Sequence, residues 1–194
     1  MEIIRKTIDK DEKYLRQISV PVNLEDNTYK EDIKVLEEFC SETKCFAFAA
    51  VQIGIPKRMV YLKNTTLDME NYDNPDYNES KILINPEIIS RIGQTKSLEA
   101  CLSCLDYAGV VSRPYKITVH YYDENGKEHK DTFEGFEATV LSHEIDHLDG
   151  ILHMDIAEEV FKMNLEERKA YREKHPYEII SKTGEYKIPE INRR

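Results

Sequence analysis

The sequence predicts an α+β fold, with strands in the middle of the chain and one central helix packed against them. Three observations lead to this prediction. Short runs of β character recur between residues 59 and 122. The pair Asn125-Gly126 follows one of them, and this dipeptide is a strong short-range signal for a β-hairpin. A helical segment then carries His143 and His147 four positions apart.

The elements follow in chain order. Residues 29–44 predict an amphipathic helix, because Ile33, Leu36, Phe39 and Cys40 recur at helical spacing. A short apolar run, residues 46–51, comes next and ends at Gln52. The strands expected after it are Met59–Leu62, Ile82–Ile89, Val110–Val111, Ile117–Tyr122 and the hairpin's return strand, Glu128–Phe133.

Two segments of this region differ from a regular strand. Residues 64–80 are rich in Asn, Asp and Glu and contain a proline, which predicts a surface loop insertion. Pro86 interrupts the run Ile82–Ile89, and a proline cannot donate to a sheet ladder. We therefore expect an edge strand or a bend there.

The helix with the two histidines is predicted to begin near Glu137 and to end near Asp149-Gly150, where glycine can adopt the left-handed cap. A last helix is predicted from Asn164 to Lys174, before Pro176. The length of 194 residues suits one domain, so we expect residues 1–194 to form a single domain, with residues 160–194 as a C-terminal helix and tail.

The composition narrows the function. With 27 basic and 37 acidic residues, the formal net charge is −10, which disfavours nucleic-acid and anionic-membrane binding. No run of 18 apolar residues is present, and the N-terminus lacks the apolar core of a signal peptide. We therefore expect a cytoplasmic protein whose cysteines are reduced and serve as core residues or metal ligands. They are Cys40, Cys45, Cys101 and Cys104.

The run from His143 to His147 is the most informative motif. On a helix, the two imidazoles lie one turn apart on the same face and can reach one divalent ion. Glu144 would lie beside a water on that ion and could take its proton, which predicts a metal-dependent hydrolase. A third ligand is required, and Cys101 is a stronger candidate than the remaining histidines. These are His120, His129, His153 and His175.

Other interpretations stay open at this point. Cys101 and Cys104 could form a redox pair, but no thioredoxin-like βαβ pattern surrounds them; Cys104 and Cys40 are better explained as packing residues. A zinc endopeptidase would use the same histidine motif with a downstream third ligand. A non-enzymatic metal-binding protein would need neither Gln52 nor Glu144. The downstream candidates for a third ligand are His153, Glu158 and Glu159.

Three motifs in order resemble the peptide deformylase family, over about residues 5–160. The family carries a glycine-rich run ending in Ala-Ala-x-Gln, then Glu-Gly-Cys-Leu-Ser, then Gln-His-Glu-x-Asp-His-Leu-x-Gly. This chain has Ala49-Ala50-Val51-Gln52, then Glu99-Ala100-Cys101-Leu102-Ser103, then Ser142 followed by His143-Glu144-Ile145-Asp146-His147-Leu148-Asp149-Gly150. Residues 11–16 also resemble the family's opening segment.

The resemblance implies small mixed or antiparallel sheets around a central metal-binding helix, with Cys101, His143 and His147 as ligands. It implies ferrous iron as the ion in the cell, with zinc, nickel or cobalt also accepted. The implied reaction removes the formyl group from the N-terminal methionine of nascent polypeptides. The expected partners are an N-formylmethionyl peptide or nascent chain and the ribosome.

The resemblance also implies residue roles. Glu144 would accept the water proton and pass it to the leaving amine. The amide of Gln52 and the backbone N–H of Leu102 would donate to the developing oxyanion. The methionine side chain would occupy an apolar pocket. Its expected residues are Phe46, Ala47, Ala100, Phe136, Thr139 and Val140.

The chain departs from the family at Cys45, Ala47, Phe48, Ala100 and Ser142. Three of these replace glycine, which permits close backbone approach. A peptide that adds as a strand needs that space. We therefore expect an altered peptide groove around an intact catalytic set, with changed selectivity, or a paralogue acting on another N-formyl or small amide substrate.

Overall fold

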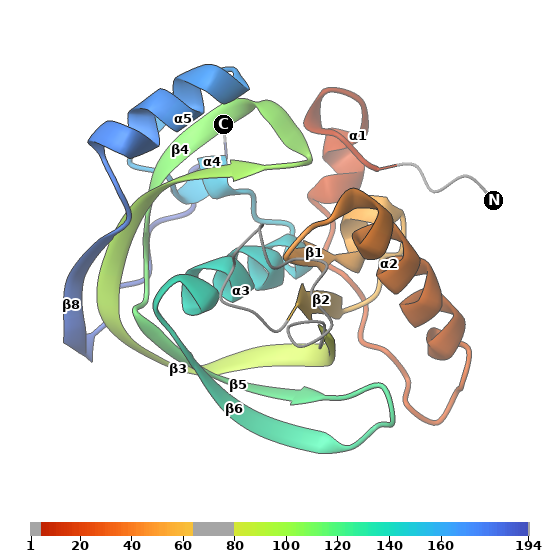
Figure 1. The fold of residues 1–194 in the computed structure, drawn as a ribbon. Coiled ribbons are helices and arrows are strands. Elements are labelled where there is room, and N and C mark those ends of the chain that lie inside the picture. Colours follow the sequence, from red (N-terminus) through yellow and green to blue (C-terminus); the bar gives the residue numbers. More distant parts are fainter. Residues whose placement is uncertain (1–4, 64–79, 194) are drawn as a thin grey trace.

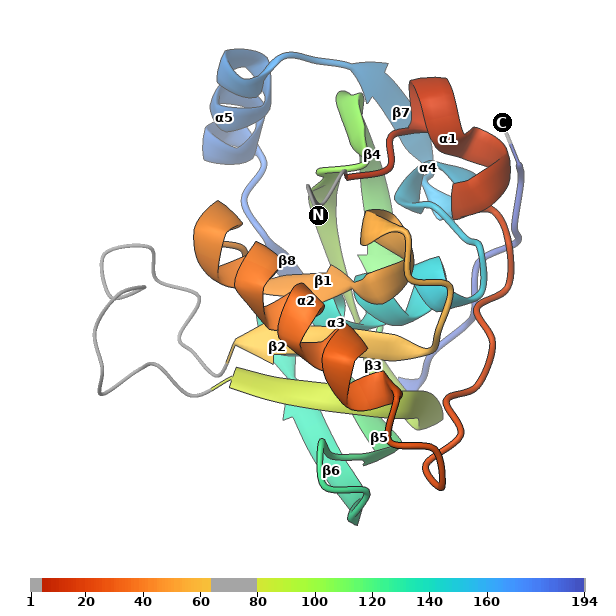
Figure 2. The same cartoon turned by 90° about the vertical axis from the view of Figure 1, so that its right-hand side faces the viewer.

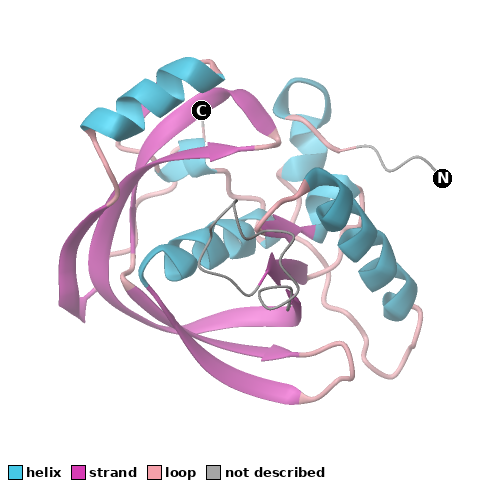
Figure 3. Ribbon diagram, viewed as in Figure 1, coloured by secondary structure: helices cyan, strands magenta, loops and turns pink. Residues whose placement is uncertain are grey.

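The computed structural model describes residues 5–63 and 80–193. It confirms the α+β class, with an antiparallel sheet curved around helices (Figures 1 and 3). The predicted loop insertion lies outside the described residues except for Ser80. The helices are α1 (Ile8–Leu15), α2 (Tyr29–Thr43), the 3-10 turn η1 (Ala50–Ile53), α3 (Gly135–Leu148), α4 (His153–Ile156) and α5 (Leu165–Lys174). The strands are β1 (Ala47–Ala49), β2 (Met59–Lys63), β3 (Ser80–Cys101), β4 (Cys104–Arg113), β5 (Lys116–Tyr122), β6 (Glu128–Glu134), β7 (Glu159–Lys162) and β8 (Glu178–Glu185).

Strand β3 organises the sheet. Along its length it pairs antiparallel with β2, β5, β8 and β4, so distant segments meet on one long strand. The mixed or antiparallel sheets that the family resemblance implied form one connected sheet of eight strands within the described residues. The last residue of β3 is Cys101, which the curved strand carries to the N-terminal helices' side of the molecule (Figures 1 and 2).

Pro86 lies at an irregular point of β3 where one side of the strand has no ladder partner, which agrees with the predicted edge or bend. The register with β5 shifts between Ile84 and Glu87, around Pro86. Pairing with β2 ends at Ile84, and residues 87–91 pair with β5 alone among the described strands. Because the register shifts at this point, the sheet requires no backbone hydrogen bond from the proline, which has no N–H to donate. Asn85 takes a φ of +52°, and its side-chain amide bonds both backbone groups of Val22, at 2.7 and 2.9 Å.

Helix α3 lies at the centre of the fold, inside the curve of the sheet (Figure 1). It begins at Gly135, two residues before the predicted start, because that glycine has a φ of +62° and turns the chain out of β6. The helix ends at Leu148, and Gly150 has a φ of +67°, as the predicted cap requires. A Cβ at Gly150 would lie 2.3 Å from the carbonyl oxygen of Arg16.

Strands β1 and β2 separate two parts of the core. Phe48 and Tyr61 pack with α2, whereas Ala49 and Val60 pack with α3. This alternation is the period of two that a strand imposes. α2 itself confirms the predicted amphipathic helix, which ends one residue earlier than expected, at Thr43. The motif residues on η1 and α3 are therefore fixed from both sides by apolar packing.

The C-terminal region contains the predicted helix and a strand that was not predicted. α5 begins after Asn164, whose side chain accepts a hydrogen bond from the Glu167 N–H at 3.0 Å in a capping box. β8 then pairs with β3 at Thr95 and Lys96. None of the helices in residues 5–63 and 80–193 has the length and apolarity needed to cross a membrane.

Candidate metal centre

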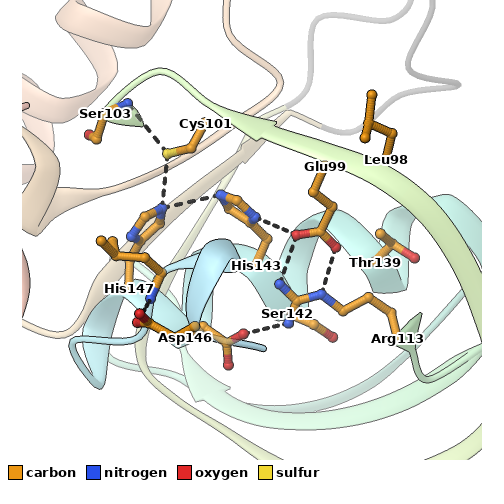
Figure 4. A network of polar contacts seen from close by, with 12 residues as sticks. Leu98, Glu99, Cys101, Ser103, Arg113, Thr139, Ser142, His143, Asp146 and His147 are labelled. Carbon is orange, nitrogen blue, oxygen red and sulfur yellow. Dashed lines mark hydrogen bonds and ion pairs between the residues drawn. The ribbon is translucent and has the colours of Figure 1, made fainter. Parts of the chain in front are cut away.

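Cys101, His143 and His147 bring their donor atoms together at the centre of the fold (Figure 4). The two imidazoles project from successive turns of α3, with their Nε2 atoms 3.2 Å apart. The sulfur of Cys101, at the end of β3, lies 3.3 Å from Nε2 of His147. All three residues are buried. In the described part of the chain, this is the only group of three or more Cys, His, Asp or Glu side chains close enough to share an ion.

The spacing of these atoms fits a single ion. A tetrahedral site with bonds of about 2.1 Å to nitrogen and 2.3 Å to sulfur separates its donors by roughly 3.4 to 3.6 Å. The observed separations of 3.2 and 3.3 Å are close to that range. The sulfur also faces two N–H donors, the backbone of Ser103 and the side-chain amide of Gln52, each at 3.4 Å.

A buried chain of charges orients the first histidine (Figure 4). Nδ1 of His143 lies 2.8 Å from the Glu99 carboxylate, which leaves Nε2 facing Nε2 of His147. Arg113 donates to both oxygens of Glu99, at 2.7 and 2.9 Å, and also pairs with Asp146 on α3. Burial raises the pKa of Glu99, but Arg113 and His143 lower it more, so the carboxyl stays ionised. This chain joins β3, β4 and α3.

Glu144 follows the first histidine and lines the adjoining cavity. Its side chain is buried, and Oε2 has no hydrogen-bond partner among the described residues. Burial raises the pKa of this carboxyl to about 7, in spite of the opposing charge of His143. A carboxylate with a free oxygen at such a position can accept a proton.

Gln52 reaches the same point from η1. Its Oε1 accepts the Ala49 N–H at 3.0 Å, which fixes the amide so that Nε2 faces Cys101 and Ser103. Leu102, the residue after the cysteine, lines the cavity beside Gln52. The structure therefore brings both proposed amide donors to the cysteine end of the cavity.

The cavity has a volume of about 670 Å³. All six predicted pocket residues line it: Phe46, Ala47, Ala100, Phe136, Thr139 and Val140. Of the positions where the chain departs from the family motifs, Cys45 and Phe48 line it too. Ser142 does not, because its hydroxyl donates to the Ala138 carbonyl within α3, at 2.7 Å. The expected alteration of the groove therefore involves the first two motifs and not the third.

Several residues of the site were not predicted. Glu99 was predicted only as a member of the second motif, without a role, and Arg113 was not predicted. The cavity is also lined by Arg172, in the last turn of α5, and by His175, Pro176 and Tyr177, which follow that helix. No local pattern marks them, since long-range pairing of β8 brings them there. The one sequence signal for Arg113 is a charged residue at the end of β4, shortly after Val110 and Val111.

The downstream ligands of the endopeptidase interpretation lie elsewhere. His153 is buried, and its ring stacks on His143 with centroids 5.8 Å apart, but it is not part of the group of three. Glu158 pairs with Lys96 at 2.5 Å and accepts a hydrogen bond from Ser112. Cys104 is fully buried and packs in the same apolar cluster as Cys101 and Leu15.

Comparisons with known proteins agree on one family. Residues 4–162 match the family model described as polypeptide deformylase. A peptide deformylase of Rhizobium meliloti is 41% identical over 147 residues, covering 73% of this chain and 78% of that protein. Peptide deformylase 2 of Clostridium acetobutylicum is 35% identical, covering 78% of this chain and 94% of that one.

Solved structures extend the agreement to the fold. A crystal structure of a peptide deformylase from Legionella pneumophila superposes with a TM-score of 0.68 at 29% identity, covering 90% of this chain and 93% of that one. One from Synechococcus elongatus, in complex with actinonin, gives 0.68 at 28% identity, covering 89% and 87%. With three ordered motifs, a shared fold and a family match over most of its length, the chain belongs to the peptide deformylase family.

Proposed function

We propose that this protein removes the formyl group from the N-terminal methionine of nascent polypeptides and releases formate. The family is metal-dependent and acts on N-formylated peptides, and the described residues include one Cys/His/His group. The observation that carries the proposal is the meeting of that group with Glu144 and Gln52 at one cavity.

In this proposal Cys101, His143 and His147 hold the ion. When bound, the ion lowers the pKa of a water and polarises the formyl oxygen. Glu144 accepts the proton of the attacking water and delivers it to the leaving amine as the C–N bond breaks. The amide of Gln52 and the backbone N–H of Leu102 donate to the oxygen on which negative charge develops.

The cavity accounts for the choice of substrate. The apolar side chains of Phe46, Phe136 and Val140 suit an unbranched, polarisable methionine side chain. Ala47 and Ala100 form the walls beside the peptide, where the family carries glycine. Their methyl groups favour a second candidate function, a divergent paralogue for another N-formyl or small amide substrate.

The proposal also covers the identity of the ion, the domain organisation, the compartment and the partner. We propose ferrous iron as the ion in the cell, with zinc, nickel or cobalt also able to bind, since thiolate and imidazole suit all four. We propose that residues 1–194 act as one catalytic domain in the cytoplasm, on chains leaving the ribosome. None of the four cysteines, all of which lie in the described residues, is in a disulfide, as a reducing compartment would maintain.

Purified protein tests the function directly. Loaded anaerobically with iron or nickel, it should release formate from a formyl-Met peptide and leave the unformylated peptide intact. Glu144→Ala should retain the metal and release formate at a rate lower by roughly 10²- to 10⁴-fold. Peptide-bond cleavage instead would identify an endopeptidase. Metal binding without either reaction would identify a binding protein.

A further inference from the structure

The residues after the family match build one side of the catalytic cavity. Arg172, His175, Pro176 and Tyr177, here called the C-terminal wall, all lie beyond residue 162 and line the cavity that contains Glu144. A second cavity of about 500 Å³ shares Ser97, Leu98 and residues 175–177 with the first. The two cavities therefore adjoin along this wall.

Several contacts hold the wall in place. The Arg172 guanidinium donates through Nε and Nη2 to the Leu98 carbonyl, at 3.3 and 3.2 Å. The ring of Tyr177 meets Phe136 edge-on, with centroids 5.4 Å apart. β8 continues from the wall and pairs with β3, so that α5 and β8 lie beside the strand that ends at Cys101 (Figures 1 and 2).

The wall carries a charge that the rest of the site does not balance. Within the described residues, Arg172 forms no ion pair, although the whole chain has a net charge of −10. Of the carboxylates around the cavity, Glu99 pairs with Arg113 and Glu158 with Lys96. Glu144 lines the same cavity as Arg172, but no ion pair joins the two in the described part of the chain. Partial desolvation against the wall and the charge of the neighbouring Arg168 lower the pKa of Arg172, an exposed residue without a partner carboxylate. The guanidinium remains charged.

Its position along β3 sets which part of a substrate it meets. Leu98 precedes Cys101 by three residues, which is roughly 10 Å along an extended strand. A peptide that lies along β3, with its formyl group at Cys101, would bring its second or third residue to Leu98 and Arg172. The methionine would occupy the inner cavity near Phe136.

On this basis, and resting on the deformylase function proposed above, we infer that Arg172 is a specificity-determining residue. It selects N-formylmethionyl chains that carry a carboxylate side chain at the second or third residue. The guanidinium would keep its contact with Leu98 and offer its remaining N–H groups to that carboxylate.

The test compares formyl-Met peptides with amidated C-termini, so that a side chain is the only carboxylate. The series places Glu, Gln or Lys at the second or third residue, and kcat/KM for formate release is measured. At one of the two positions, the parent protein should prefer Glu over Gln by about threefold, the scale of a part-exposed ion pair. The preference should shrink at 0.5 M salt, where the Debye length falls to a few ångströms.

Variants assign the effect to one residue. Arg172→Gln keeps a donor for Leu98 but should remove the preference, and Arg172→Glu should reverse it in favour of Lys. Lys169→Glu makes the same charge change on the same helix at an exposed residue outside both cavities, and should leave the preference unchanged. In a separate measurement, the affinity for the same peptides without the formyl group gives the binding of the reaction product.

The outcomes separate the two proposals. Equal kcat/KM for Glu and Gln at both positions overturns the inference, as does an equal loss of preference in the Arg172 and Lys169 variants. Formate release from none of the peptides, including the neutral ones, defeats the deformylase function. In that case the affinity for the unformylated peptides still tests Arg172. An affinity that depends on the peptide's charge and is reversed by Arg172→Glu supports the selecting role of Arg172. An affinity that does not depend on charge refutes it.

Discussion

The metal centre and the C-terminal wall face the same cavity but are built differently. Cys101, His143 and His147 are buried, and buried ion pairs fix the residues behind them. Arg172 is exposed, and the wall is held by a guanidinium–carbonyl contact, a ring contact and a short ladder. The first arrangement couples the chemistry to the stability of the fold. The second allows selectivity to change at little cost in stability.

Breaking the buried charges should give the largest effect. Arg113→Met leaves the buried Glu99 carboxylate with His143 as its remaining partner and removes the ion pair of the partly buried Asp146 carboxylate. The free energy of unfolding should fall by about 3–5 kcal/mol, the usual result when one partner of a buried ion pair is removed. Urea unfolding of the chelator-treated protein measures this change without a contribution from bound metal.

A more exposed pair serves as the control for that experiment. Arg58 pairs with Asp149 at 2.6 Å, and nearly half of the Asp149 side chain is exposed. Arg58→Met should therefore lower stability by at most about 1 kcal/mol. Similar losses for the two arginine variants would contradict the contrast between a buried network and a solvated surface.

The sequence predicted the part of this centre that depends on local geometry. Helical spacing places His143 and His147 on one face whatever surrounds them. Cys101 was only a favoured candidate from its residue type, and the family resemblance was needed to assign it. The Glu99–Arg113–Asp146 chain was not predicted, because it joins side chains from β3, β4 and α3 that no local sequence pattern relates.

The position of the C-terminal wall was even less predictable from the sequence than the buried chain of charges. Residues 178–185 carry no strong strand pattern, and their pairing with β3 brings together positions about eighty apart in the chain. His175 looked unremarkable beside Pro176, yet both line the cavity. Local propensity was sufficient for α5, where Asn164 and Glu167 form a capping box, but not for where that helix docks.

A second experiment alters the metal centre while leaving its charges in place. Gln52→Leu removes the amide that faces the Cys101 sulfur but preserves the side-chain size. We expect kcat to fall by about 10²- to 10³-fold with little change in KM, as for loss of one oxyanion donor. Gln94→Leu deletes a β3 glutamine bonded to Ser112 and outside the cavity, so its kcat should stay near the parent value. A pure KM effect in Gln52→Leu would instead assign Gln52 to substrate binding.

The smallest effect is expected at the wall. Tyr177→Ala removes the edge contact with Phe136, and aromatic pairs of this kind contribute about 0.5–1.5 kcal/mol. Because the contact shapes the cavity and touches none of the proton-handling groups, KM should rise by roughly two- to tenfold with kcat nearly constant. Tyr177→Phe keeps the ring and should behave like the parent. A loss of kcat in Tyr177→Ala, restored in Tyr177→Phe, would show that the wall positions the reacting groups, and the division between chemistry and selectivity would then no longer hold.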